Sequence, residues 1–391
     1  MPFGNGITPI VRRGGGVVRR RRTGTPPVET KQFLPRIESL RGLAALMVVG
    51  YHVWDMFSDT PATGLGAAAF YALKGMTNGV GAVVAFFVIS GFVLARSLDR
   101  NDDPIRFFRN RVLRLLPAAA FVVALLSALH FQFGIYVGYE ASFDPVNILL
   151  NMVMIKSDIN GPMWSMTVEC FAAPLIFGAC LLVKSRGVRS LLIPSVLLFG
   201  LSFVGQYVHL LGDRTSLAPL YAFAAGIFIH FRGTELAARL SPRWVTGAAI
   251  FSIIAFCVCG LGGRQAALVL AGDCLSAAIL VALIISFPTA AVFRPLDFKI
   301  IRFYGRISYS LYLLHMLGIG AAFRIFQTLG FDSFALPPFA GALVTTGLAI
   351  VCTTPLAYLS WRFVERPFLS LASAKTLEVG VPAPVMRGRR L

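Results

Sequence analysis

The first long apolar segment of this 391-residue chain begins with an arginine and has a histidine well inside it. Arg41 and His52 are eleven residues apart, separated only by Gly, Leu, Ala, Met, Val and Tyr. On an α-helix, eleven steps of about 100° come within about 20° of three full turns, which puts both side chains on one face, about 16 Å apart along the axis. An ionisable side chain at membrane depth is costly and marks a functional site by default.

The pair has a chemical interpretation and a structural one. A neutral imidazole is well suited to take a proton from a hydroxyl group, which makes His52 a candidate general base. The structural alternatives are a histidine that hydrogen-bonds a neighbouring helix and an arginine that reaches out to the membrane interface. Under either reading, Arg41 lies at the membrane edge and His52 lies inside the hydrocarbon.

A second set of basic residues precedes the third apolar segment. Arg111 and Arg114 share one helical face at i, i+3 spacing, and Pro117 follows them. One interpretation is an amphipathic helix that lies on anionic lipid. The other is a phosphate clamp for a nucleotide-bearing donor, because guanidinium groups bind phosphates through two parallel hydrogen bonds.

Glu169 is an acid about one and a half turns inside the fourth apolar segment, near its predicted outer end. Trp164 opens that segment and is typical of a membrane interface. The carboxylate is either a structural acid with a buried partner, or a functional group that orients His52 or binds the hydroxyls of an acceptor.

Polar residues also recur in the ninth apolar segment. Ser308, Tyr312 and His315 follow i, i+4, i+7 spacing and form one stripe, which lines a cavity or fastens two helices together. Ser90 in the second segment is a further candidate for the lining of a cavity. Asp273 is a buried acid that has no evident partner in the sequence.

Composition identifies a membrane protein. Mean hydropathy is +0.73, 56% of residues are hydrophobic and only 14% are charged. The formal net charge of +18 does not indicate nucleic acid, because the charge lies in short loops between apolar segments. The six cysteines fall in or beside apolar segments without a metal-ligand spacing, which predicts buried, reduced thiols and no metal site.

We therefore predict an all-α polytopic membrane protein with a bundle of about ten transmembrane helices. Residues 1–34 are predicted to be a disordered basic tail, 35–370 the transmembrane domain and 371–391 a second tail. The segment 143–156 is too short to span and is predicted to be interfacial or re-entrant. The ten spans are expected at 38–58, 77–98, 116–136, 164–183, 190–211, 216–231, 242–260, 265–286, 303–323 and 338–361.

Loop charges predict the orientation of these spans. If both termini are cytoplasmic, 31 of the 36 Lys and Arg residues fall on the cytoplasmic side and 5 on the other. This asymmetry is the positive-inside pattern, and it favours a multi-pass protein of the inner (plasma) membrane.

These stretches together resemble the acyltransferase 3 family, the integral-membrane O-acyltransferases of bacterial surface polysaccharides. The resemblance covers roughly residues 35–370 and follows six fragments in order. They are Leu34 to His52, Phe86-Phe-Val-Ile-Ser-Gly-Phe-Val-Leu94, Arg111-Val-Leu-Arg114 with Pro117, Trp164-Ser-Met-Thr-Val-Glu169, Gly305-Arg-Ile-Ser-Tyr-Ser-Leu-Tyr-Leu-Leu-His315 and Val364-Glu-Arg-Pro367.

The resemblance implies transfer of an acyl group, usually acetyl, from cytoplasmic acyl-CoA to a hydroxyl of a glycan or glycolipid. Acyl-CoA is then a co-substrate, with no bound cofactor and no nucleic-acid partner. His52 matches the family's essential histidine; Arg41, Arg111 and Arg114 match its required arginines and would hold the CoA phosphates. The pantetheine arm would extend between the first, second and ninth spans. The sequence departs from the family after Glu169, where Cys170-Phe-Ala-Ala-Pro174 replaces a second acid and an aromatic run.

A rival interpretation is a transporter or flippase in which buried acids and histidines relay protons. The chain has few paired spans broken by Gly or Pro and no evident two-fold repeat, which counts against this class. The residues available for such a relay are His52, Glu169, Asp273 and His315.

Overall fold

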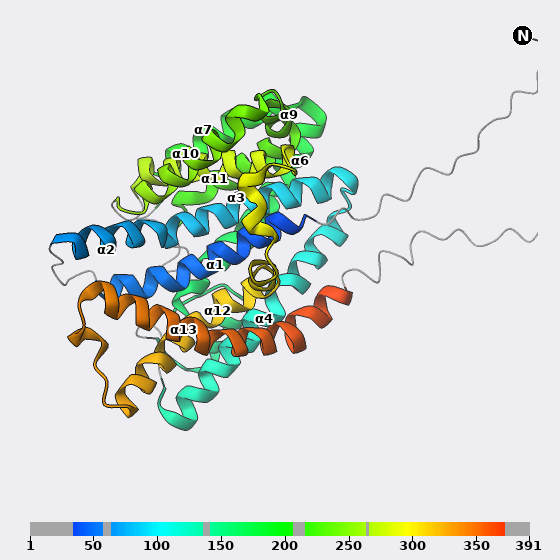
Figure 1. Ribbon diagram of the computed structural model, residues 1–391. Coiled ribbons are helices and arrows are strands. Elements are labelled where there is room, and N and C mark those ends of the chain that lie inside the picture. The colour runs from blue at the N-terminus through cyan, green and yellow to red at the C-terminus, as the bar shows by residue number, and fades with distance from the viewer. Residues whose placement is uncertain (1–33, 58–63, 136–140, 206–215, 263–265, 372–391) are drawn as a thin grey trace, which may run out of the picture. The chain divides into compact units, whose positions relative to one another are not determined.

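The regular structure of the chain is helical throughout the part described by the computed structural model (Figure 1), namely residues 34–57, 64–135, 141–205, 216–262 and 266–371. Apart from Leu34 and Leu371, the two predicted tails lie outside these ranges. The α-helices are α1 (Pro35–Met56), α2 (Gly64–Met76), α3 (Gly79–Arg100), α4 (Pro104–Phe133), α5 (Pro145–Met152), α6 (Trp164–Arg186), α7 (Leu192–Leu201), α8 (Tyr221–Phe228), α9 (Thr234–Ala238), α10 (Pro242–Cys259), α11 (Ala267–Ser286), α12 (Lys299–Thr328) and α13 (Pro338–Ser360).

Each of the ten predicted spans contains helix within the described residues, and the interfacial segment 143–156 contains the short helix α5. Within the described ranges, seven helical segments are long and apolar enough to cross a membrane. They are Gly64–Arg100, Pro104–Phe133, Gly161–Arg186, Pro242–Cys259, Ala267–Ser286, Lys299–Thr328 and Pro338–Leu371.

Three predicted spans are not among those seven. The α1 helix contains Arg41, His52 and Asp55, which lower its hydropathy. The span 190–211 is described only up to residue 205 and contains the ten-residue α7. The span 216–231 lies in the helical run 218–238, whose second half contains His230, Arg232 and Glu235, and these lower its hydropathy. The structure thus supports a helical membrane bundle, with seven of the ten spans meeting the criteria of length and hydropathy.

The two helices that carry the predicted histidines run side by side in the same direction. Near their starts, a Cβ atom added to Gly42 of α1 would lie only 2.7 Å from the carbonyl carbon of Tyr304 in α12. Glycine permits this close approach, as small residues commonly do between membrane helices. Further along α1, Trp54 and Phe57 pack in an apolar cluster with Ile319 of α12. Residues of α1 and α12 between these contacts therefore face one another.

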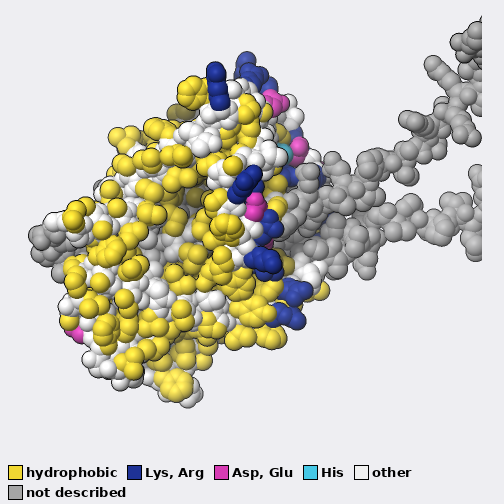
Figure 2. All heavy atoms as spheres, viewed as in Figure 1, with side chains coloured by type: hydrophobic (Ala, Val, Ile, Leu, Met, Phe, Trp, Pro, Cys, Tyr) yellow, Lys and Arg dark blue, Asp and Glu magenta, His cyan; other side chains and the backbone are white. Residues whose placement is uncertain are grey.

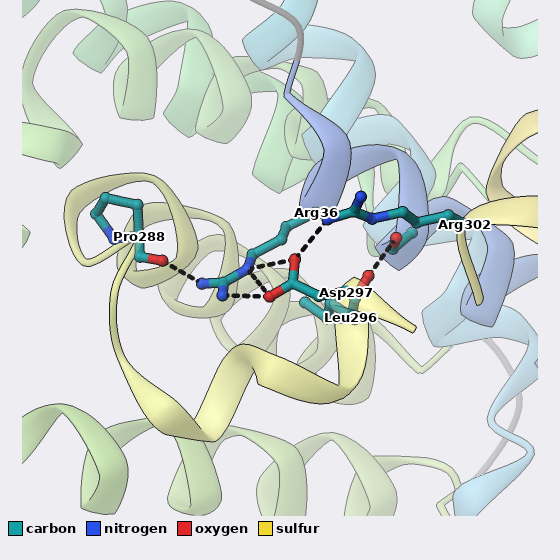
Figure 3. Close-up of polar contacts among 6 residues, drawn as sticks. Arg36, Pro288, Leu296, Asp297 and Arg302 are labelled. Atoms are coloured by element: carbon teal, nitrogen blue, oxygen red, sulfur yellow. Dashed lines mark hydrogen bonds and ion pairs between the residues drawn. The ribbon is translucent and has the colours of Figure 1, made fainter. Parts of the chain in front are cut away.

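Basic side chains gather at one end of the bundle. Figure 2 shows Lys and Arg along the edge where α1 begins and the segment after α13 ends. Arg36 at the start of α1 makes an ion pair with Asp297 (Nη2 to Oδ2, 2.5 Å) and donates to the Pro288 carbonyl at 2.6 Å (Figure 3). Arg302 in the first turn of α12 contacts the same carboxylate at 3.0 Å. These contacts fix the starts of α1 and α12 to the turn that contains Asp297.

Candidate functional site

The site is a series of three groups of polar side chains inside the apolar bundle. We call the group nearest the basic end the inner group and the group farthest from it the outer group. The outer group contains both predicted histidines. The rings of His52 on α1 and His315 on α12 have centroids 5.1 Å apart and are tilted by 31°. His315 is wholly buried, and its Nδ1 lies 2.6 Å from the Tyr312 carbonyl oxygen. His52 is half-buried. The structure thus places the candidate base beside a second imidazole.

The start of α6 is fastened to this outer group through Tyr312. The Tyr312 hydroxyl lies 2.7 Å from both the Pro162 carbonyl oxygen and the Ser165 hydroxyl. Asn160 donates to the Leu313 carbonyl at 2.9 Å. The predicted stripe of Ser308, Tyr312 and His315 is buried along its length and, through Tyr312, joins α12 to α6.

A buried ion pair forms the middle group. Arg111 Nη2 lies 2.7 Å from Glu169 Oε1, with the two side chains only 8% and 13% exposed. Ser90 of α3 donates to the same carboxylate oxygen at 2.6 Å. Three predicted site residues from α3, α4 and α6 therefore meet at one carboxylate. The Nε atom of Arg111 is buried and makes no hydrogen bond within the described residues, so the guanidinium keeps donor capacity for a ligand.

The inner group surrounds Arg41. Its charged neighbours include Arg114 of α4, Glu169 and Glu365. Glu365 lies in the π-helical turn Trp361–Glu365 that follows α13. It is buried and accepts a hydrogen bond from Ser310 of α12 at 3.1 Å. The two arginines thus share a confined space with buried carboxylates, which reduces the cost of burying positive charge.

The sequence analysis did not predict the partners of Glu169 and Glu365. Glu169 was expected to be either a structural acid with a buried partner or a group that orients His52 or binds an acceptor; the partners that the structure gives it are Ser90 and Arg111. Glu365 was expected at the cytoplasmic edge of the last span and carried no predicted role. A signal was present, because this acid stands between Arg362 and Arg366, directly after an apolar span, in a chain with few acids.

Asp273 has a partner that its sequence position does not suggest. It is wholly buried in α11 and accepts a hydrogen bond from Asn78, whose Nδ2 lies 2.7 Å from Oδ1. The same Asn78 caps α3 by accepting from the Gly81 N–H at 2.8 Å. Asp273 therefore stabilises the start of α3. It takes no part in the ion pair at Glu169. Within the described residues, no group of three or more His, Cys, Asp or Glu side chains could hold a metal ion.

Comparison with known proteins identifies the fold's family. Residues 34–361 match the model of the acyltransferase 3 family, which is described as an acyltransferase domain. The chain is 23% identical over 316 residues to an O-acetyl transferase of Shigella phage Sf6, covering 75% of this chain and 86% of the relative. It is 26% identical over 320 residues to the exopolysaccharide production protein ExoZ of Rhizobium meliloti (strain 1021), covering 78% and 94%. No solved structure matches the chain.

The matched range begins one residue before α1 and ends one residue after α13, so it contains all the α-helices and the polar groups described above except Glu365. This membership favours an enzyme over the proton-relaying transporter. The chain belongs to the acyltransferase 3 family and is a multi-pass membrane acyltransferase.

Proposed function

We propose that the protein transfers an acetyl group from cytoplasmic acetyl-CoA to a hydroxyl of a glycan or glycolipid acceptor. The observation that carries this proposal is the series of polar groups between Arg41, near the basic end of the bundle, and His52 on the same helix. The names of the two relatives, an O-acetyl transferase and an exopolysaccharide production protein, supply the acyl group and the acceptor class.

The arginines are the proposed binding groups for the CoA phosphates. Arg41 and Arg114 are half-buried toward the basic end, where a cytoplasmic donor would enter. Arg111 is more fully buried and retains its Nε donor beyond the ion pair with Glu169. Guanidinium groups bind phosphates strongly because both the charge and the geometry match. The pantetheine arm would then follow α1 between α3 and α12 for much of the distance of about 16 Å to His52.

His52 is the proposed general base. It takes the proton of the acceptor hydroxyl as the oxygen attacks the thioester carbonyl carbon, and the carbon–sulfur bond breaks. The imidazolium then returns the proton to the departing CoA sulfur, so that the products are the ester and free CoA. Transient transfer of the acyl group to the ring is the alternative use of the same histidine. Glu169 would keep Arg111 and Ser90 in place beside the donor.

The proposed orientation places the basic end in the cytoplasm of a cell with the protein in its inner membrane. The helices in the ten predicted spans, including α1, then cross the bilayer, and both ends of the chain are cytoplasmic. The asymmetry of 31 against 5 basic residues supports this orientation.

The decisive experiment compares His52→Ala with wild type. Membranes that contain each protein are incubated with acetyl-CoA labelled in the acetyl group, and base-labile label in glycans and lipids is counted. We expect His52→Ala to insert normally and to lose at least 100-fold of the transfer rate, because the proton acceptor is gone. His230→Ala is the matched control, since that histidine pairs with Asp99 outside the polar series. Substantial transfer by a well-folded His52→Ala protein would refute the role of His52.

Mass spectrometry of surface glycans then identifies the acceptor. A strain without the gene should lack one acetyl group per modified unit, and the wild-type gene should restore it. Saturable solute flux without any use of acetyl-CoA would instead support a transporter.

A further inference from the structure

The imidazole of His315 has an orientation that its sequence position does not reveal. Its Nδ1 atom lies 2.6 Å from the Tyr312 carbonyl oxygen. A carbonyl oxygen only accepts hydrogen bonds, so Nδ1 must carry the ring proton. His315 is 0% exposed, and a charged ring at that position would be costly without a carboxylate partner. The ring is therefore neutral, and its Nε2 atom carries a lone pair.

This Nε2 atom is buried and has no hydrogen-bond partner in the described residues. Buried polar atoms in proteins are nearly always hydrogen-bonded, so an unpaired acceptor calls for an explanation. The ring beside it is His52, with a centroid separation of 5.1 Å. Two imidazoles joined by an N–H···N bond of about 3 Å have centroids about 5 Å apart, because each ring adds about 1 Å. The spacing is thus already that of a hydrogen-bonded pair.

Glu169 does not offer the His52 N–H an equivalent acceptor, because its carboxylate contacts other groups. Its carboxylate receives the Ser90 hydroxyl and pairs with Arg111. His315 is held by Tyr312, whose hydroxyl is in turn fixed to Ser165 and Pro162. A base needs a neighbour that fixes its tautomer and receives the N–H opposite the reacting nitrogen. The rigidly held ring of His315 meets that need.

We propose that His315 is a positioning residue for His52: its Nε2 accepts the N–H of the His52 ring, so that the other His52 nitrogen acts as the base. A modest rotation of the His52 ring completes this bond. His315 neither gains nor loses a proton in the reaction, because the proton of the acceptor hydroxyl passes to His52 and then to the CoA sulfur. This inference rests on the proposed function of His52 as a base.

Two isosteric variants separate this role from a structural one. In His315→Asn, the side-chain amide replaces Nδ1 and can still donate to the Tyr312 carbonyl, but the acceptor at Nε2 is lost. In His315→Gln, the side-chain oxygen reaches the position of Nε2 and restores the acceptor. With labelled acetyl-CoA and native membranes, we expect kcat of His315→Asn to fall at least 100-fold with KM for acetyl-CoA within twofold of wild type. We expect His315→Gln to stay within tenfold of wild type.

A second measurement does not depend on acyl transfer. Diethylpyrocarbonate modifies neutral imidazoles, and mass spectrometry of the peptide that contains His52 gives the rate of that modification. We expect His315→Gln to keep the rate within twofold and His315→Asn to lower it at least fivefold. Equal rates for the two variants in both measurements would overturn the role of His315. Absence of acetyl transfer by wild type, with the difference in modification retained, would contradict the proposed function and leave the histidine pair supported.

Discussion

At the scale of single residues, the middle of the site depends on one buried ion pair. Arg111 and Glu169 come from different helices, and each is the other's ion-pair partner. Breaking a buried pair on one side is far more costly than replacing both partners with apolar groups of similar size. The pair therefore contributes to the stability of the bundle and to donor binding, and the two contributions can be separated.

We predict that Glu169→Gln destabilises the protein by about 3 kcal/mol, since it leaves Arg111 charged and without its counter-ion. The double variant Arg111→Met with Glu169→Met should recover most of the lost stability. It should nevertheless bind acetyl-CoA at least tenfold more weakly than wild type, because the guanidinium is gone. Thermal unfolding in detergent and equilibrium binding of labelled acetyl-CoA measure the two effects. Full acetyl-CoA binding by the double variant would show that Arg111 does not hold the donor.

Some of these features could be predicted from the sequence alone, and others could not. The spacing of Arg41 and His52 lies within one helix, and hydropathy is a property of each segment by itself. Both could therefore be interpreted without knowing which helices are neighbours. The pairing of Glu169 with Arg111 and the contact of His52 with His315 depend on which helices are neighbours. That choice depends on close packing such as Gly42 against Tyr304, which no periodicity in one segment reveals.

At the scale of helices, α3 and α8 pack through two glycines. A Cβ atom added to Gly91 would lie 3.0 Å from the Phe223 carbonyl carbon, and one added to Gly226 would lie 2.6 Å from the Phe92 nitrogen. Both obstacles are backbone atoms, which can yield only if the helices separate. Ser90 adjoins Gly91, so the same contact sets the position of the group that donates to Glu169.

We predict that Gly91→Ala lowers the unfolding midpoint by several degrees and reduces acetyl transfer. Gly247→Ala in α10 is the matched control: that glycine is also inside a helix but has no neighbouring atom within 4 Å of an added Cβ. Alanine is the better helix former, so the control should be neutral or stabilising by up to about 1 kcal/mol. Thermal unfolding of both variants is the measurement, and equal midpoints would argue against the close contact between α3 and α8.

The ion pair between Arg36 and Asp297 holds the start of α1, and its strength depends on pH. Hydrogen bonds from Arg36 hold the pKa of Asp297 below its ordinary value of 3.8. A carboxyl with a lowered pKa in the folded state adds stability above its unfolded pKa and loses it as the pH falls through the folded pKa. Solvent screens part of this effect, since the Asp297 side chain is 34% exposed.

We therefore predict that Asp297→Asn unfolds at a lower temperature than wild type at pH 7. The difference should persist to about pH 4 and shrink below it, as the wild-type carboxyl becomes protonated. Thermal unfolding between pH 7 and pH 3 measures this difference. A difference between the two proteins that is constant across the range would show that the loss comes from packing and not from charge.

At the scale of the whole molecule, the polar groups connect two chemically different ends. Ion pairs and basic side chains cover the end where α1 begins, whereas His52 lies toward the other end of the same helix. A donor bearing several phosphates is attracted to the basic end before any specific contact forms. The interior then offers guanidinium groups first and imidazoles further along. This order suits an enzyme whose donor and acceptor approach from opposite sides of a membrane.

That arrangement predicts the orientation of the protein in the cell. Asn101→Cys and Ser241→Cys place exposed thiols at the basic end, whereas Ser142→Cys and Thr328→Cys place them at the opposite end. With a membrane-impermeant maleimide on intact cells, we expect only the last two to be labelled, and all four after the membrane is permeabilised. Wild type, whose cysteines are buried or half-buried, provides the background. Labelling of Asn101→Cys in intact cells would place the basic end outside, where acetyl-CoA is absent, and would contradict a cytoplasmic donor.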